Sequence, residues 1–262
     1  MNSSEFLALQ RQHGIPNSII FTAPGVKIDF VCIDWLHTAD LGVTQSIAGN
    51  ALWECLNYLE GSTLQARVTV LWKRLKTYYK QVHSPSQFQK LTLEMIRMPG
   101  KGPKLRGKAA ETRYIVPFVL QLTAEFADRS KHAALVHQVV EHLSNLYMYL
   151  DATPFPAELA ADECQSLCDK YLALHLESEC LGIPKHWKMK PKFHLLQELL
   201  QYDCLRTKQS PRLYWTYADE SWGGIVAAIA TRKGGPKNAA AIGLTVMQRY
   251  RAFIGNVSFH ED

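Results

Sequence analysis

The sequence predicts a mainly α-helical protein with a small β element near its N-terminus. Apolar residues recur at helical spacing along most of the chain after residue 44. The convincing strand signals are confined to Ser18–Phe21 and Lys27–Ile33, on either side of a turn at Pro24-Gly25. Hydrophobic residues make up 47% of the 262 residues and charged residues 20%, which is typical of a globular chain rather than a disordered one.

The expected helices follow one another with short breaks. The clearest apolar stripe runs through His132–Leu150, and a second long helix is expected to end at Gly182 and Pro184. Pro117 is expected to kink the helix that contains it. The other helical patterns cover Asn2–His13, Thr44–Leu59, Leu64–Tyr79, Ser86–Arg97, Thr112–Phe126, Ala157–Glu179, Lys192–Tyr202, Asp219–Thr231 and Lys237–Ile254.

The composition also bears on the cellular compartment. No run approaches the ~18 apolar residues of a membrane span, so no membrane partner is expected. The N-terminus lacks the basic and apolar regions of a secretory signal, which predicts a nuclear or cytoplasmic location. Cys164 and Cys168 lie one helical turn apart, but no second Cys/His pair at zinc-site spacing accompanies them, so a structural role is favoured.

The most informative short stretch is Asp34-Trp35-Leu36-His37, directly after an apolar, β-like run. A carboxylate at the end of a strand, with an imidazole one helical turn on, can hold a divalent metal or orient a phosphate. The same spacing also suits an aspartate that caps a helix N-terminus beside a partly buried histidine. Both interpretations are open at the level of the sequence.

Three further segments follow this motif in order. They are Leu105–Leu120, Lys190–Leu196 and Trp215–Gly224. The series resembles the C-terminal part of DDE transposases with an RNase H-like core, of the CACTA-like and related kinds. The resemblance covers about Ile28 to Arg251.

The resemblance implies a partial RNase H-like core with a large helical insertion, in a single domain over residues 1–262. Residues 1–43 would form the β-containing start, 44–190 the insertion and 191–262 the C-terminal helices. The resembled enzymes carry catalytic aspartates on strands well upstream of the Asp-x-x-His motif. Only Glu5 and Asp29 are acidic before Asp34. The resemblance therefore implies a fragment, a decayed copy or a domesticated derivative.

By the same resemblance, the candidate catalytic residues are Asp34, His37, His194 and Glu220. Asp34 and Glu220 would ligate Mg²⁺ or Mn²⁺ if the protein is active, and we expect both to approach His37. Two-metal phosphodiester chemistry normally needs at least three carboxylates, so Asp29 or Asp40 would have to supply another. The residues also allow ordinary roles: His194 on an amphipathic helix, and Glu220 (or the adjacent Asp219) in a first helical turn.

Basic residues gather in two places, although the net charge is only +5. Six lie between Arg97 and Arg113 against one acid, and the glycines and prolines among them predict a flexible loop. Four lysines lie between Lys185 and Lys192. Such segments are either solvated or track phosphates. The candidate nucleic-acid-binding residues are Lys101, Lys104, Arg106, Lys108, Arg113, Lys188, Lys190 and Lys192.

Three functions are consistent with these patterns. The first is a transposase-derived protein, not catalytically competent alone, with non-specific DNA binding. The alternative is a helical protein-interaction scaffold without a nucleic-acid role. The third is an active metal-dependent nuclease or strand transferase, for which a pocket joining Asp34, Glu220 and a third acid would be needed. The sequence leaves the oligomeric state open.

Overall fold

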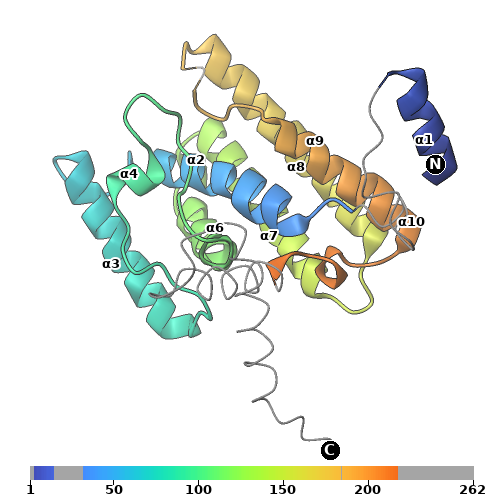
Figure 1. Ribbon diagram of the computed structural model, residues 1–262. Helices are drawn as coiled ribbons and strands as arrows, with labels where there is room; N and C mark the ends of the chain where they lie inside the picture. Colours follow the sequence, from blue (N-terminus) through green and yellow to red (C-terminus); the bar gives the residue numbers. More distant parts are fainter. Residues whose placement is uncertain (1–2, 15–31, 184, 218–262) are drawn as a thin grey trace, which may run out of the picture. The chain divides into compact units, whose positions relative to one another are not determined.

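The computed structural model describes residues 3–14, 32–183 and 185–217. In these ranges the regular secondary structure is helical and no strand occurs, which confirms the mainly α class (Figure 1). The expected strand Ser18–Phe21 and most of Lys27–Ile33 lie outside the described residues. Cys32 and Ile33, at the end of the second expected strand, have irregular backbone.

The helices match most of the expected series. The α-helices are α1 Ser3–Gln12, α2 Gln45–Cys55, α3 Leu64–Val82, α4 Leu93–Ile96, α5 Ala109–Tyr114, α6 Val116–Ala124, α7 Lys131–Asp151, α8 Ala157–Cys180, α9 Pro191–Glu198 and α10 Leu205–Thr207. Two π-helical segments, η3 Leu36–Thr44 and η5 Leu199–Cys204, precede α2 and follow α9, and short 3₁₀ turns occupy Ala127–Arg129 (η4) and Pro211–Leu213 (η6). The expected helices Asp219–Thr231 and Lys237–Ile254 lie outside the described residues.

The chain separates into two compact units, residues 1–214 and 215–262. The expectation of a single domain over 1–262 stays a prediction. Only residues 215–217 of the second unit are described, where the rings of Trp215 and Tyr217 pack edge to face with centroids 4.8 Å apart.

Helix α2 lies in the middle of the larger unit, between α6, α7 and α4 (Figure 1). Most of its residues are buried, including the fully buried Ile47, Ala51 and Leu52. Its small residues allow neighbouring backbone to come close: a Cβ at Gly49 would lie 2.4 Å from the backbone nitrogen of Leu105. The resulting core sits between α2, α6, α7 and α8, with buried apolar side chains from each.

Two expected helices differ from the structure. The pattern Thr112–Phe126 is divided into α5 and α6 at Ile115 instead of being kinked at Pro117. Pro117 stands in the first turn of α6, where its missing N–H has no helical partner to lose.

The pattern Ser86–Arg97 forms only the short helix α4, so that prediction was wrong for Ser86–Thr92. The backbone N–H of Phe88 donates instead to the Tyr79 hydroxyl at 3.3 Å, and the Phe88 side chain is buried. Thr92 is the N-cap residue of α4, and its hydroxyl accepts from the backbone N–H of Met95 at 3.3 Å. Tertiary contacts, rather than helical propensity, set the path of this segment.

Candidate functional site

The two basic segments lie together in the structure, although about eighty residues separate them in the sequence. The basic loop, Gly100–Arg106, and the basic turn, Lys185–Lys190, line one cavity of about 440 Å³. Its lining residues are Asn50, Gly100, Lys101, Gly102, Pro103, Lys104, Arg106, Lys185, Lys188 and Lys190. Six of these ten residues are cationic and none is acidic, so the cavity suits an anion.

The basic loop is fixed against α2 and α4 by backbone hydrogen bonds. The N–H of Lys104 donates to Ile96 (2.9 Å), that of Leu105 to Gln45 (2.8 Å), and that of Arg106 to Met95 (2.8 Å). Within the loop, the side chain of Leu105 is fully buried. The flexible loop predicted from the glycines and prolines is therefore a packed segment, because its backbone N–H groups find partners in two helices.

The basic turn is fixed by Asn50, a polar residue on the buried face of α2. The Asn50 side chain accepts from the backbone N–H of Trp187 at 2.9 Å and donates to the carbonyls of Ser46 (2.8 Å) and Pro103 (3.4 Å). Trp187 is fully buried, with its ring centroid 5.5 Å from that of Tyr171. One side chain thus connects both basic segments to the same helix.

Two lysine side chains also connect the cavity walls. The Lys185 ammonium donates to the Gly100 carbonyl at 2.8 Å, and the Lys190 ammonium donates to the Ser46 hydroxyl at 2.9 Å. At Gly102 a Cβ would lie 2.0 Å from the Lys185 carbonyl oxygen, so the two segments are in backbone contact there. Only glycine allows this approach.

The cations of the cavity crowd one another. Burial lowers the pKa of Lys104, and the nearby charges of Lys192 and Arg106 lower it further. Burial likewise lowers the pKa of Lys190, followed by the charges of Lys104, Lys188 and Lys192. Within the described ranges, no salt bridge to an acid forms at any of the six cations that line the cavity. The positive charge is therefore uncompensated by side chains in this part of the chain.

The other predicted nucleic-acid-binding residues lie at different places. Lys192 is not part of the cavity lining and contacts the Asp-x-x-His motif instead: its ammonium donates to the His37 carbonyl at 2.5 Å. Lys108 is exposed at the start of α5, outside the cavity lining. Arg113 points elsewhere, since its guanidinium donates to both carboxylate oxygens of Asp151, at 2.8 and 3.0 Å.

Asp34 caps the helical segment that begins at Trp35. One carboxylate oxygen accepts from the backbone N–H of Leu36 (3.3 Å), and the other from the N–H of His37 (2.9 Å). The second oxygen also lies 2.5 Å from Nδ1 of His37, whose side chain is half exposed. The geometry matches the N-cap interpretation of this motif.

The remaining candidate catalytic residues are not brought to this motif by any described contact. His194 is exposed on α9, with Nε2 4.0 Å from Glu198 on the same helix. Glu220 lies outside the described residues. Within the described part of the chain, no group of three or more His, Cys, Asp or Glu residues could hold a metal ion. A Mg²⁺ or Mn²⁺ site involving Glu220 therefore stays a prediction, and the described donors alone do not fit a two-metal centre.

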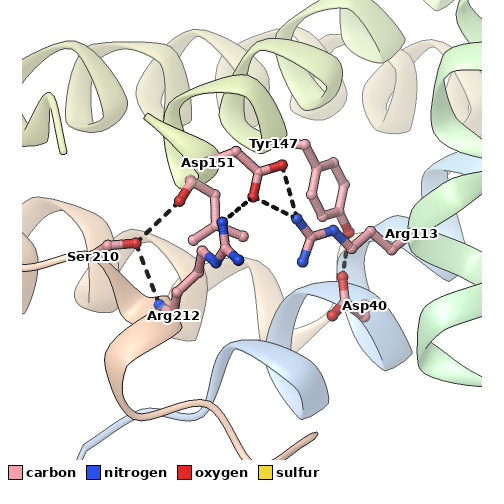
Figure 2. Close-up of polar contacts among 7 residues, drawn as sticks. Asp40, Arg113, Tyr147, Asp151, Ser210 and Arg212 are labelled. Atoms are coloured by element: carbon pink, nitrogen blue, oxygen red, sulfur yellow. Dashed lines mark hydrogen bonds and ion pairs between the residues drawn. The ribbon is translucent and has the colours of Figure 1, made fainter. Parts of the chain in front are cut away.

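A polar network lies beside the motif and was not expected as a site; it is buried around Asp40 and exposed at Asp151 and Arg212 (Figure 2). Asp40, which is fully buried on η3, accepts from the Tyr147 hydroxyl, and the same hydroxyl lies 2.7 Å from the Thr44 hydroxyl. Arg113 spans the network: its guanidinium carbon lies 5.6 Å from the Tyr147 ring centroid, and Asp151 and Asp40 raise its pKa against the effect of burial.

The same network reaches the end of the larger unit. Arg212 donates to Asp151 at 2.6 Å, and the Ser210 hydroxyl donates to the Leu150 carbonyl at 3.2 Å (Figure 2). One signal in the sequence could have pointed to it, because Asp40 is an acid between the apolar residues Ala39 and Leu41. The network joins η3, α5, α7 and the segment before residue 214, so we assign it a structural role.

No family model, curated protein or solved structure was found to match this chain. Within the described residues, no helix has both the length and the apolar character needed to cross a membrane.

Proposed function

We propose that the chain is a transposase-derived protein that binds DNA through the phosphate backbone and does not read base sequence. It would comprise part of an RNase H-like catalytic domain with its helical insertion, and would not be catalytically competent alone. The order of the four sequence motifs supports the origin. The observation that carries the binding role is the cavity in which the basic loop and the basic turn meet without an acidic side chain.

The physical basis is electrostatic. Lysine and arginine side chains that neutralise phosphates release condensed counterions, and this provides most of the non-specific affinity for DNA. The cations belong to two segments whose backbone is already held in place by hydrogen bonds. Binding therefore does not require the loop to become ordered, which would cost entropy. Within the described residues no group of His, Cys, Asp or Glu could hold the zinc ion of a zinc finger, which is consistent with binding that is indifferent to sequence.

The test is duplex DNA binding by the full chain as a function of salt, followed by fluorescence anisotropy. We expect the logarithm of the affinity to fall linearly with the logarithm of salt concentration, with a slope of about −0.9 for each phosphate neutralised. Replacing Lys101, Lys104, Arg106 and Lys188, which all line the cavity, with alanine should flatten the slope and weaken binding to all sequences alike.

A matched variant controls for net charge. Lys73, Lys76, Lys80 and Lys90 are exposed and lie outside the cavity, so replacing these four with alanine removes the same charge but should change the slope much less. Absence of binding at low salt, or equal losses in the two quadruple variants, would contradict the proposal. Either result would favour the protein-interaction scaffold.

A further inference from the structure

The cavity between the basic loop and the basic turn has the size of a small-ligand site. Its volume of about 440 Å³ falls within the ~300–1,000 Å³ usual for small-molecule pockets. A DNA duplex is much wider than such a cavity and would contact only its rim. The interior is therefore available to something smaller than a duplex.

The lining is selective for charge and offers little to a nucleobase. No aromatic side chain lines the cavity, although Trp53 and Trp187 lie on the flanking segments. Base recognition in single-stranded nucleic acids relies on stacking against aromatic rings. The lining instead offers ammonium and guanidinium groups, the Asn50 amide and the backbone of Gly100 and Gly102, and the cationic groups are typical partners of phosphate oxygens.

The cations are held close together by the fold. The contacts Lys185 to Gly100 and Lys190 to Ser46 fix two of the ammonium groups, at 2.8 and 2.9 Å. Lys104 and Lys190 are partly buried, and each lies near other cations. An anion in the cavity would relieve this repulsion, and several negative charges in a small volume would relieve it best.

We infer that this cavity is a site for a compact cluster of phosphate groups, bound through its oxygens without contact to a base. Two sources share this chemistry: a free inorganic polyphosphate, and the 5′-phosphorylated end of a nucleic acid strand. The second source rests on the proposed DNA-binding function, and the first does not.

Isothermal titration of the full chain with inorganic tripolyphosphate at low salt tests the site. We expect one tripolyphosphate per chain, and an affinity about tenfold or more lower in the double variant Lys104→Gln/Lys190→Gln, because two charge-assisted contacts are lost. The double variant Lys104→Arg/Lys190→Arg keeps both charges and should retain most of the affinity. The variant Lys73→Gln/Lys80→Gln removes the same charge outside the cavity and should bind like the unmodified protein. Circular dichroism confirms that each variant keeps its helical content.

Single-stranded oligonucleotides with a 5′-phosphate or a 5′-hydroxyl separate the two sources. A gain from the 5′-phosphate that disappears in Lys104→Gln/Lys190→Gln supports the strand end. Tripolyphosphate binding without such a gain supports the free polyphosphate. No tripolyphosphate binding by the folded protein, or an equal loss in Lys73→Gln/Lys80→Gln, overturns the inference. Duplex binding measured in parallel distinguishes this inference from the proposed function. If only the duplex binds, the phosphate site is rejected and the proposed function stands. If only tripolyphosphate binds, the phosphate site stands and the proposed function is rejected.

Discussion

At the scale of single residues, Asp34 has a structural role within its own segment. Its carboxylate accepts from two backbone N–H groups and lies against the His37 imidazole. These contacts satisfy donors that the first turn of a helix leaves without intrahelical partners. Asp34 therefore acts as the cap of this helical segment.

Replacing Asp34 tests this role. Asp34→Ala should lower the free energy of unfolding by about 1 kcal/mol, the usual effect of losing an N-cap. Asp34→Ser should retain most of the stability, because a serine hydroxyl can accept the same N–H bond but is a poor metal ligand. Urea denaturation measures both. A loss in Asp34→Ser as large as that in Asp34→Ala would show that the carboxylate itself is needed.

His132 provides a second residue-scale feature. Its Nδ1 lies 2.7 Å from Glu177 and its Nε2 lies 3.7 Å from Glu54. The Glu54 carboxylate, which faces the imidazole, raises the pKa of His132 from 6.5 to about 9 against the effect of burial, and the hydrogen bond with Glu177 raises it further. His132 and His186 in turn lower the pKa of Glu54 to about 2, although burial opposes this.

The pH dependence of stability follows from these shifts. Because the folded pKa of His132 is raised, its stabilisation is fully present below pH 6.5 and is lost as the pH rises through about 9. Since the cluster is partly exposed, we expect a loss on the order of 1 kcal/mol. The free energy of unfolding should fall between pH 6.5 and 9, and His132→Gln should remove most of this slope. An unchanged slope in the variant would mean that other groups cause it.

At the scale of secondary structure elements, α2 organises the site. Ser46 and Asn50 stand one turn apart on its buried face and contact Lys190 and Trp187. Gly49 lies between them in sequence and lets the backbone of Lys104 and Leu105 approach the helix. A single helix thus positions both the basic loop and the basic turn.

Replacing Gly49 and Gly42 with alanine, one at a time, tests how closely neighbouring backbone approaches this helical region. Alanine normally favours a helix over glycine by up to about 1 kcal/mol. At Gly49, however, the added Cβ would lie 2.4–2.6 Å from backbone atoms of Lys104 and Leu105. Gly49→Ala should therefore lower the free energy of unfolding by about 1–3 kcal/mol and displace the basic loop.

Gly42→Ala is the matched control. Its shortest contact, 2.4 Å, is with Cδ of the Lys192 side chain, which can rotate away more easily than backbone. We expect a smaller loss of stability there, measured by thermal unfolding of both variants. A larger loss at position 42 would contradict the backbone-contact argument.

At the scale of the whole molecule, three carboxylates of the described residues have separate structural partners. Asp34 is engaged as a cap, Asp40 is fully buried with Tyr147, and Asp151 is paired with Arg113 and Arg212. Two-metal phosphodiester cleavage needs several carboxylates that converge on one pair of ions. The described part of the chain does not gather them.

We therefore expect no cleavage of duplex DNA by the full chain in Mg²⁺ or Mn²⁺. The melting temperature should also be the same with either ion and with a chelator, since a tight metal site would raise it. Gel analysis of a supercoiled plasmid and thermal unfolding provide the two measurements. Cleavage that is lost in both Asp34→Asn and Glu220→Gln would instead support the nuclease hypothesis.

The sequence alone determined the helical class and the bounds of the long helices, because apolar periodicity is a local property that packing preserved in α3, α7 and α8. It also identified both basic segments. Their meeting in one cavity was decided by the tertiary structure, since it depends on contacts made by Asn50, Gly49 and Gly102. Two of the partners of Asn50, Pro103 and Trp187, lie 53 and 137 residues away in the sequence. Likewise, Asp40 acquires its place in a buried network only through Tyr147, 107 residues later. Spacing along the chain does not encode such contacts, because they arise when separate helices bury their faces against one another.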